Sequence, residues 1–188
     1  MQRFLIPLFV LAILLSACGG GAVAVECASD YWDGAVGACL PKGWSVLDKE
    51  TLKERGVPEE TIAAFRREES VSGQFPTVTV TSEVLASAVP PAAADYSSSS
   101  IRAVSVLPGY SVIETPPMDI DGQEVSLHVF SAQPVPDEPA RRFYQASSVK
   151  GNIGYTITAA APVFAEKELD GEIRLIFENV TFEKAEEE

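Results

Sequence analysis

The sequence predicts an α+β fold in which helices cover a mainly antiparallel sheet. In one segment Tyr155, Ile157 and Ala159 alternate with Thr156 and Thr158, which is typical of a strand with one buried face. The segment from 169 to 182 follows, with apolar residues at helical spacing: Leu169, Ile173, Ile176, Phe177 and Val180. A strand followed by a one-sided helix favours a layered domain, with the helix lying on the sheet.

The first 17 residues have the features of an export signal. Arg3 provides a positive charge, and residues 4–15 form an apolar stretch that is too short to span a bilayer. The following Leu15-Ser16-Ala17-Cys18 resembles the lipobox of bacterial lipoproteins. We therefore expect removal of residues 1–17, lipidation of Cys18 and a stable acyl anchor in a bacterial membrane. The alternative is a plain secretory signal followed by a coincidental cysteine.

The charge of the chain disfavours several classes of partner. The formal net charge is −13, and it becomes one unit more negative if Arg3 is removed with the signal. Such a chain is repelled by nucleic acids and by anionic lipid surfaces, so no nucleic-acid partner is expected. Residues 18–26 are interpreted as a tether, 27–183 as a single domain and 184–188 as an acidic tail.

The remaining cysteines, Cys27 and Cys39, predict a disulfide. An even pair in an exported protein is expected to be oxidised. Asp33-Gly34 between them is a hairpin-turn signal, so the bond would join the ends of a small hairpin. Two free thiols are the alternative. A metal site is disfavoured because two cysteines and the distant His128 do not make a ligand set.

The first half of the domain predicts a strand, two short helices and a second strand. A strand is expected at 44–46, and Asp48 is placed to cap a helix that Gly56 ends. Pro58 is expected to begin another helix, with Ile62 and Phe65 facing inward. The next strand, 75–81, shows clear alternation, with the inward side chains being Val78 and Val80.

The second half predicts a helix and a four-stranded meander. Asp95 is expected to cap a helix that ends near Pro108-Gly109. The strands are expected at 110–115, 125–129, 141–149 and 154–159, with a hairpin turn at Asp121-Gly122 and a long turn at 134–139. This order of elements corresponds to an antiparallel sheet flanked by helices.

Three phrases resemble the PsbP-like (Mog/PsbP) family, an α/β/α sandwich that includes envelope lipoproteins of the DcrB and LpqN kind. They are Leu40-Pro41-Lys42-Gly43-Trp44, Leu107-Pro108-Gly109-Tyr110 with Asp121-Gly122, and the strand from Gly154 with its following helix. The resemblance covers about residues 39–182. It implies a bacterial cell-envelope location, with the domain on the extracytoplasmic side, and action by protein binding without catalysis.

No catalytic, cofactor or metal motif is present in the sequence. His128 is the single histidine, and no nucleophile elbow or phosphate-binding loop accompanies it. We expect a lipid-anchored protein-binding or assembly module, with an envelope protein as partner. Its possible partner surface is the charged rim formed by Asp137, Glu138, Arg141 and Arg142. The alternative is a carrier of a small ligand or lipid, with a pocket between sheet and helix.

Overall fold

An antiparallel sheet of seven strands organises the computed structural model, which describes residues 25–183. The strands of the sheet are β3 (Trp44–Val46), β4 (Thr61–Arg67), β5 (Thr77–Val84), β6 (Ser111–Glu114), β9 (His128–Ala132), β10 (Arg141–Lys150) and β11 (Ile153–Pro162). Their order is β3-β4-β5-β11-β10-β9-β6. Two hairpins lie outside it: β1 (Cys27–Trp32) with β2 (Gly37–Pro41), and β7 (Pro117–Ile120) with β8 (Gln123–Ser126). The helices are α1 (Lys49–Glu54), α2 (Ala93–Val104) and α3 (Lys167–Glu178).

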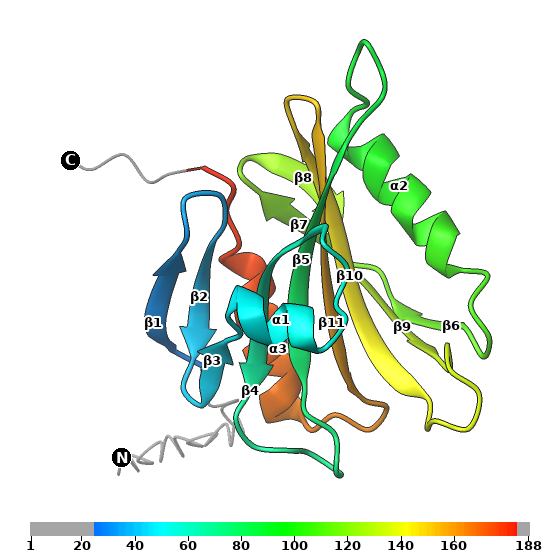
Figure 1. Cartoon of the computed structure of the whole chain (residues 1–188). Coiled ribbons are helices and arrows are strands. Elements are labelled where there is room, and N and C mark those ends of the chain that lie inside the picture. The colour runs from blue at the N-terminus through cyan, green and yellow to red at the C-terminus, as the bar shows by residue number, and fades with distance from the viewer. Residues whose placement is uncertain (1–24, 184–188) are drawn as a thin grey trace, which may run out of the picture.

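Helices cover both faces of the sheet, which confirms the predicted sandwich. In Figure 1, α3 lies behind the sheet, whereas α1 lies in front of it and α2 runs along β10 at the right. The α3 side holds the core, where the alternating Ile157 and Ala159 of β11 are fully buried with Ile173 and Phe177 of α3. Because successive side chains of a strand point to opposite faces, the threonines of β11 lie on the α2 side.

The predicted meander is present, with one interruption. β6, β9, β10 and β11 are consecutive neighbours in the sheet. The expected single strand at 125–129 is instead divided, because β8 ends at Ser126 and β9 begins at His128. Val125, Leu127 and Val129 nevertheless all enter the core, as their alternation predicted.

The expected helix after Pro58 is wrong, since Thr61–Arg67 is strand β4. β4 pairs with β3 on one side and β5 on the other, and Ala63, Ala64 and Phe65 in its middle are all buried. A short apolar run that is buried on both faces has no strand periodicity to distinguish it from a helix. Here strand pairing overrides the helix-start signal of Pro58 and the acids that follow it.

The helix boundaries also differ from expectation. Asp48 does cap α1, accepting a hydrogen bond of 2.7 Å from the backbone N–H of Thr51. The N-cap of α2 is Ala92, and Asp95 lies in the first turn instead. α3 ends at Glu178, so Val180 and Phe182 are buried from an extended segment. That segment pairs with β2 through a backbone bridge between Thr181 and Gly37.

Gly154 lets α2 approach the sheet closely. A Cβ at this position would lie 2.5 Å from Cζ and Oη of Tyr96, the aromatic side chain of α2. The Tyr96 hydroxyl donates a 2.7 Å hydrogen bond to Glu83 of β5, which holds the ring over the glycine. The contact therefore requires a residue without a side chain in β11.

We predict that Gly154→Ala lowers the free energy of unfolding by about 1–3 kcal/mol, because the Tyr96 ring must move off the sheet. Urea denaturation measures the change. The control is Gly171→Ala inside α3, where a Cβ would lie 3.2 Å from a Val25 methyl group. In that variant the free energy of unfolding should be unchanged or rise by up to about 1 kcal/mol, because alanine has a higher helix propensity than glycine. Equal destabilisation by the two variants would contradict the prediction.

His128 is a buried polar group of the α2 side. It is 1% exposed and stacks on Phe130, with ring centroids 5.1 Å apart. Its Nε2 lies 2.8 Å from Oη of Tyr110, and its Nδ1 lies 3.0 Å from Oγ1 of Thr115. A neutral imidazole has one donor and one acceptor, so one hydroxyl accepts and the other donates. Burial lowers the pKa of His128 below its ordinary value of 6.5.

This shift predicts acid sensitivity. The unfolded chain holds the His128 proton more tightly, so the stabilisation is complete above pH 6.5 and is lost as the pH falls below it. The free energy of unfolding should therefore fall measurably between pH 7.5 and 5.5. His128→Gln should lack this part of the slope, since the chain has one histidine. Identical slopes in urea titrations at each pH would refute the assignment.

Candidate functional site

The antiparallel sheet divides the domain into two ends. At one end of the sheet, β4 and β11 end and their neighbours β5 and β10 begin. Four loops therefore meet at this end: 41–43, 68–76, 133–140 and 163–166. We call this the proximal end, since Val25, the first described residue, lies beside Lys167 of α3 there. The distal end carries the β5–α2 loop and the turn at 150–152. In Figure 1 the proximal end is at the bottom and the distal end at the top.

Three of the four predicted rim residues lie together at the proximal end: Asp137 and Glu138 in the β9–β10 loop, and Arg141 at the first position of β10. Arg141 Nη2 donates to Glu138 Oε2 at 2.9 Å, with both side chains partly exposed. Asp137 lies in the same turn, with a left-handed φ of 70°. A small hollow of about 140 Å³ lies beside this pair, lined also by Val135 and Phe143.

Arg142 is separated from the other three. It follows Arg141 directly in β10, so its side chain points to the opposite face of the sheet. There its Nη1 lies 3.8 Å from Oδ1 of Asp170 in α3. Asp170 also accepts hydrogen bonds of 2.7 Å from both Tyr144 Oη and Arg174 Nε. The rim is therefore two charge clusters on opposite faces.

The Asp170 cluster is held in its ionised form. Burial by itself would raise the pKa of Asp170. The hydrogen bonds from Arg174 and Tyr144 and the charges of Arg174 and Arg142 outweigh burial and lower that pKa. Burial and the same carboxylate raise the pKa of Tyr144 to about 12. Arg142 is thus committed to a structural cluster that joins β10 to α3.

A broad groove of about 1150 Å³ runs beside the first described residues at the proximal end. The buried Glu172 of α3 lies at its wall and accepts hydrogen bonds from Trp44 Nε1 at 2.9 Å and Arg67 Nε at 3.0 Å. Buried side-chain atoms without a partner occur in Arg66, Gln74, Arg142 and Gln145, none of which lines this groove. Among residues 25–183, the lining of the groove therefore includes no buried side-chain polar atom without a hydrogen-bond partner.

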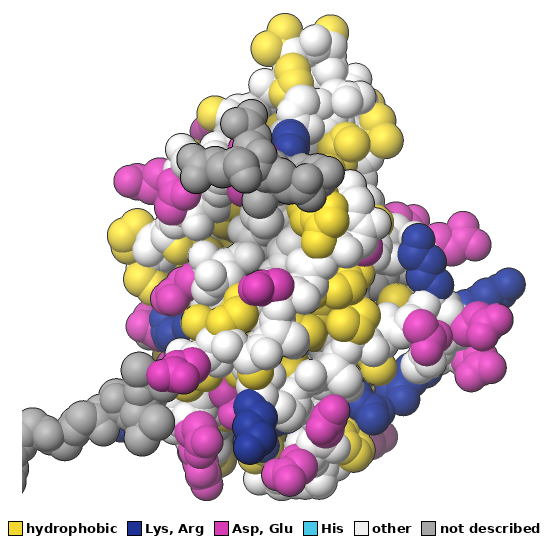
Figure 2. All heavy atoms as spheres, turned by 90° about the vertical axis from the view of Figure 1, so that its left-hand side faces the viewer, with side chains coloured by type: hydrophobic (Ala, Val, Ile, Leu, Met, Phe, Trp, Pro, Cys, Tyr) yellow, Lys and Arg dark blue, Asp and Glu magenta, His cyan; other side chains and the backbone are white. Residues whose placement is uncertain are grey.

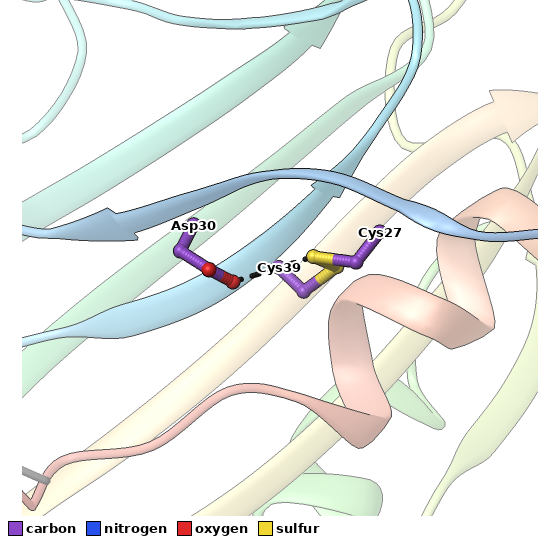
Figure 3. A group of neighbouring side chains, drawn as sticks. All are labelled: Cys27, Asp30 and Cys39. Carbon is purple, nitrogen blue, oxygen red and sulfur yellow. Dashed lines mark hydrogen bonds between the residues drawn. A yellow bond between two sulfur atoms is a disulfide. The ribbon is translucent and has the colours of Figure 1, made fainter.

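The expected disulfide between Cys27 and Cys39 is present in the β1–β2 hairpin, with a Cα–Cα distance of 5.5 Å. Asp30 lies beside it, with Oδ1 at 3.3 Å from Sγ of Cys27 (Figure 3). Among residues 25–183, these three side chains are the one group of three or more potential metal ligands whose ligand atoms lie close enough together to hold an ion. Sulfur atoms joined to each other are not thiolates, so the cluster has no metal-binding chemistry.

The distal end carries an exposed apolar loop that is not among the site residues predicted from the sequence. We define residues 84–91 as the apolar tip. Val84 is 75% and Val89 77% exposed. The tip is held in place by a hydrogen bond of 2.8 Å from Leu85 N to Asn152 O and by a local one from Ser87 Oγ to Val89 O. Figure 2 shows hydrophobic side chains at this upper extremity.

The signal for the tip was available in the sequence. Between Glu83 and Asp95 the chain has no charged residue, and Pro90-Pro91 follows a run of valine, leucine and alanine that only Ser87 interrupts. Apolar residues without period next to a proline pair indicate an apolar turn as well as a break. No helix among residues 25–183 is long and apolar enough to cross a bilayer.

No protein-family model matches the chain, and no curated protein matches it by sequence. Solved structures do resemble it. Cyanobacterial PsbP (CyanoP) from Synechocystis sp. PCC 6803 is 16% identical, with 90% of this chain and 99% of that chain covered and a TM-score of 0.56. LpqN, involved in cell envelope biogenesis of Mycobacterium tuberculosis, is 12% identical, with 81% and 88% covered and a TM-score of 0.58. These likenesses establish the fold: the domain is PsbP-like, as the three sequence phrases implied.

Proposed function

We propose that this chain is a lipid-anchored, non-catalytic protein of the bacterial cell envelope that binds a partner protein. The observation that carries the proposal is the apolar tip, a protruding loop that leaves Val84 and Val89 in solvent. Exposed apolar groups gathered on a protruding loop favour a protein–protein contact. The backbone hydrogen bond of Leu85 fixes the loop before binding, which reduces the entropy lost on association.

The packing favours a binder over a carrier. Ile157 of the sheet and Ile173, Ile176 and Phe177 of α3 are all 0% exposed, so side chains fill the layer between them. Neither the hollow beside Val135 nor the proximal groove lies within that layer. A carrier needs a concave, mostly apolar site, and this interface is already occupied by the protein itself.

The environment of His128 supports a non-catalytic role. General acid–base work requires a base within hydrogen-bond reach of a reacting group. Both ring nitrogens of His128 already face hydroxyl groups, and aromatic rings enclose the side chain. Cys27 and Cys39 are bonded to each other, so neither is a nucleophile.

The envelope location is supported by the disulfide and by the lipobox. Stable disulfides are typical of extracytoplasmic proteins. Cys18, the proposed lipidation site, lies outside the described residues, and the domain begins only a few residues after it. LpqN, a protein of the same fold, is itself involved in cell envelope biogenesis.

The charged rim of Asp137, Glu138 and Arg141 is proposed as a secondary partner surface. Exposed ion pairs add little affinity but steer association, whereas buried apolar contacts dominate the binding energy. Arg142 contributes less to this surface because Asp170 engages it on the other face.

We predict that Cys18→Ala abolishes membrane attachment, because the lipid has no other acceptor cysteine once Cys27 and Cys39 are paired. Metabolic labelling with a fatty acid and fractionation of the envelope measure this. Ser16→Ala, which keeps a small residue before the cysteine, is the control and should be labelled normally. Continued labelling of Cys18→Ala would show that the anchor is elsewhere.

We also predict that Val84→Ser with Val89→Ser reduces capture of the partner at least tenfold, since about 1.5–3 kcal/mol is lost for each valine no longer buried. Crosslinking in the native envelope with quantitative mass spectrometry identifies the captured protein. Val106→Ser, at a valine of similar exposure (83%), is the matched control. Glu138→Lys should change how strongly partner capture depends on salt concentration more than it changes the amount of partner captured. Equal capture by tip variant and control would remove the tip from the proposal.

A further inference from the structure

Phe164 is the most exposed large apolar residue in the described part of the chain, at 90%. It lies in the short loop between β11 and α3, at the proximal end. Two neighbouring loops carry further exposed apolar side chains, Phe75 at 47% and Val135 at 48%. The strand pairing places these loops side by side, since the end of β11 pairs with the starts of β5 and β10. The proximal end thus presents apolar side chains from three separate loops.

The chain outside the structure leaves from this same end. Val25 packs against Gly171 of α3 and lines the groove that Lys167 also lines, and Lys167 is three residues after Phe164. The stretch from Cys18 to Val25 reaches at most about 25 Å when fully extended. β11 alone, with 10 residues, spans about 33 Å from one end of the sheet to the other. A lipid on Cys18 would therefore hold the proximal end nearer the bilayer than the distal end.

The proximal end carries cations as well as acids. The net charge of −13 would repel anionic headgroups. At the proximal loops, however, cations lie among the acids, and Figure 2 shows both kinds of side chain side by side at the lower extremity. The cations there are Lys42, Arg66, Arg67, Arg141 and Lys167, and the acids beside them are Glu68, Glu69, Asp137, Glu138, Glu166 and Glu168. This mixture suits a zwitterionic phospholipid surface and not an anionic one.

We propose that the proximal end lies on the phospholipid bilayer, with Phe164 inserted at the boundary between headgroups and acyl chains. This inference rests on the proposed lipid anchor. An aromatic ring on a protruding loop gains apolar burial there without placing a charge in hydrocarbon. Phe75 and Val135 border this contact. In this orientation the rim of Asp137, Glu138 and Arg141 lies beside the headgroups. The apolar tip faces away from the membrane, so the tip and not the rim is the surface that a partner protein reaches.

The test uses the mature lipidated protein in phosphatidylcholine vesicles. Phe164→Cys and Val89→Cys are each labelled with an environment-sensitive nitrobenzoxadiazole probe while the native disulfide stays oxidised. Both positions are highly exposed, so neither substitution removes core packing, and circular dichroism verifies folding. We expect several-fold enhancement of the emission at position 164 on reconstitution, with quenching by spin-labelled lipid. The probe at position 89 should respond to neither.

Each other outcome overturns the proposal in a distinguishable way. If the protein floats with the vesicles but both probes stay in water, the anchor stands and the orientation is wrong. If only the probe at position 89 is quenched, the distal end faces the bilayer. If the probe at position 164 is shielded in native envelopes but not in vesicles, a protein covers Phe164. If the protein does not float at all, the lipid anchor fails, and the orientation fails with it.

Discussion

The arrangement of the domain depends on the carboxylate of Glu172. It is 5% exposed and accepts hydrogen bonds from Trp44 of β3 and Arg67 of β4. A buried charge is tolerated only when it is paired, and losing one partner would cost roughly 3 kcal/mol, the low end of the range, because Arg67 keeps 21% exposure. The three groups therefore fix α3 against one edge of the sheet. The same contact positions the loop of Phe164 and the start of the described chain, since both lie at the first turns of α3.

Local patterns in the sequence were sufficient to predict most of the sheet. Val78, Val80 and Ile157 are fully buried, as their alternation indicated. Asp121 and Gly122 both have positive φ and join β7 to β8 in a two-residue turn, as expected from the type of residues. The disulfide could also be predicted, because two cysteines around a turn signal have few alternatives. These features depend on neighbours within a few residues.

Features that depend on distant neighbours could not be predicted in this way. Glu172 looks like any polar residue of a helix, and its partner Trp44 is 128 residues away. β4 was mistaken for a helix because its strand character comes from β3 and β5 on either side. The rim was a different case: alternation within β10 alone separates Arg141 from Arg142, so the sequence contained the information that these two arginines face opposite ways.

The antiparallel sheet gives the domain a direction along its strands. Each connection must return to one end or the other, so the loops form two groups separated by the length of a strand. The proximal group surrounds the first described residues and the buried Glu172, whereas the distal group holds the apolar tip through Leu85 and Asn152. A rigid sheet between them keeps the tip at a constant distance from the point where the chain leaves the domain. Under the proposed function, the proximal end would serve for attachment and the distal end would present a preformed apolar surface.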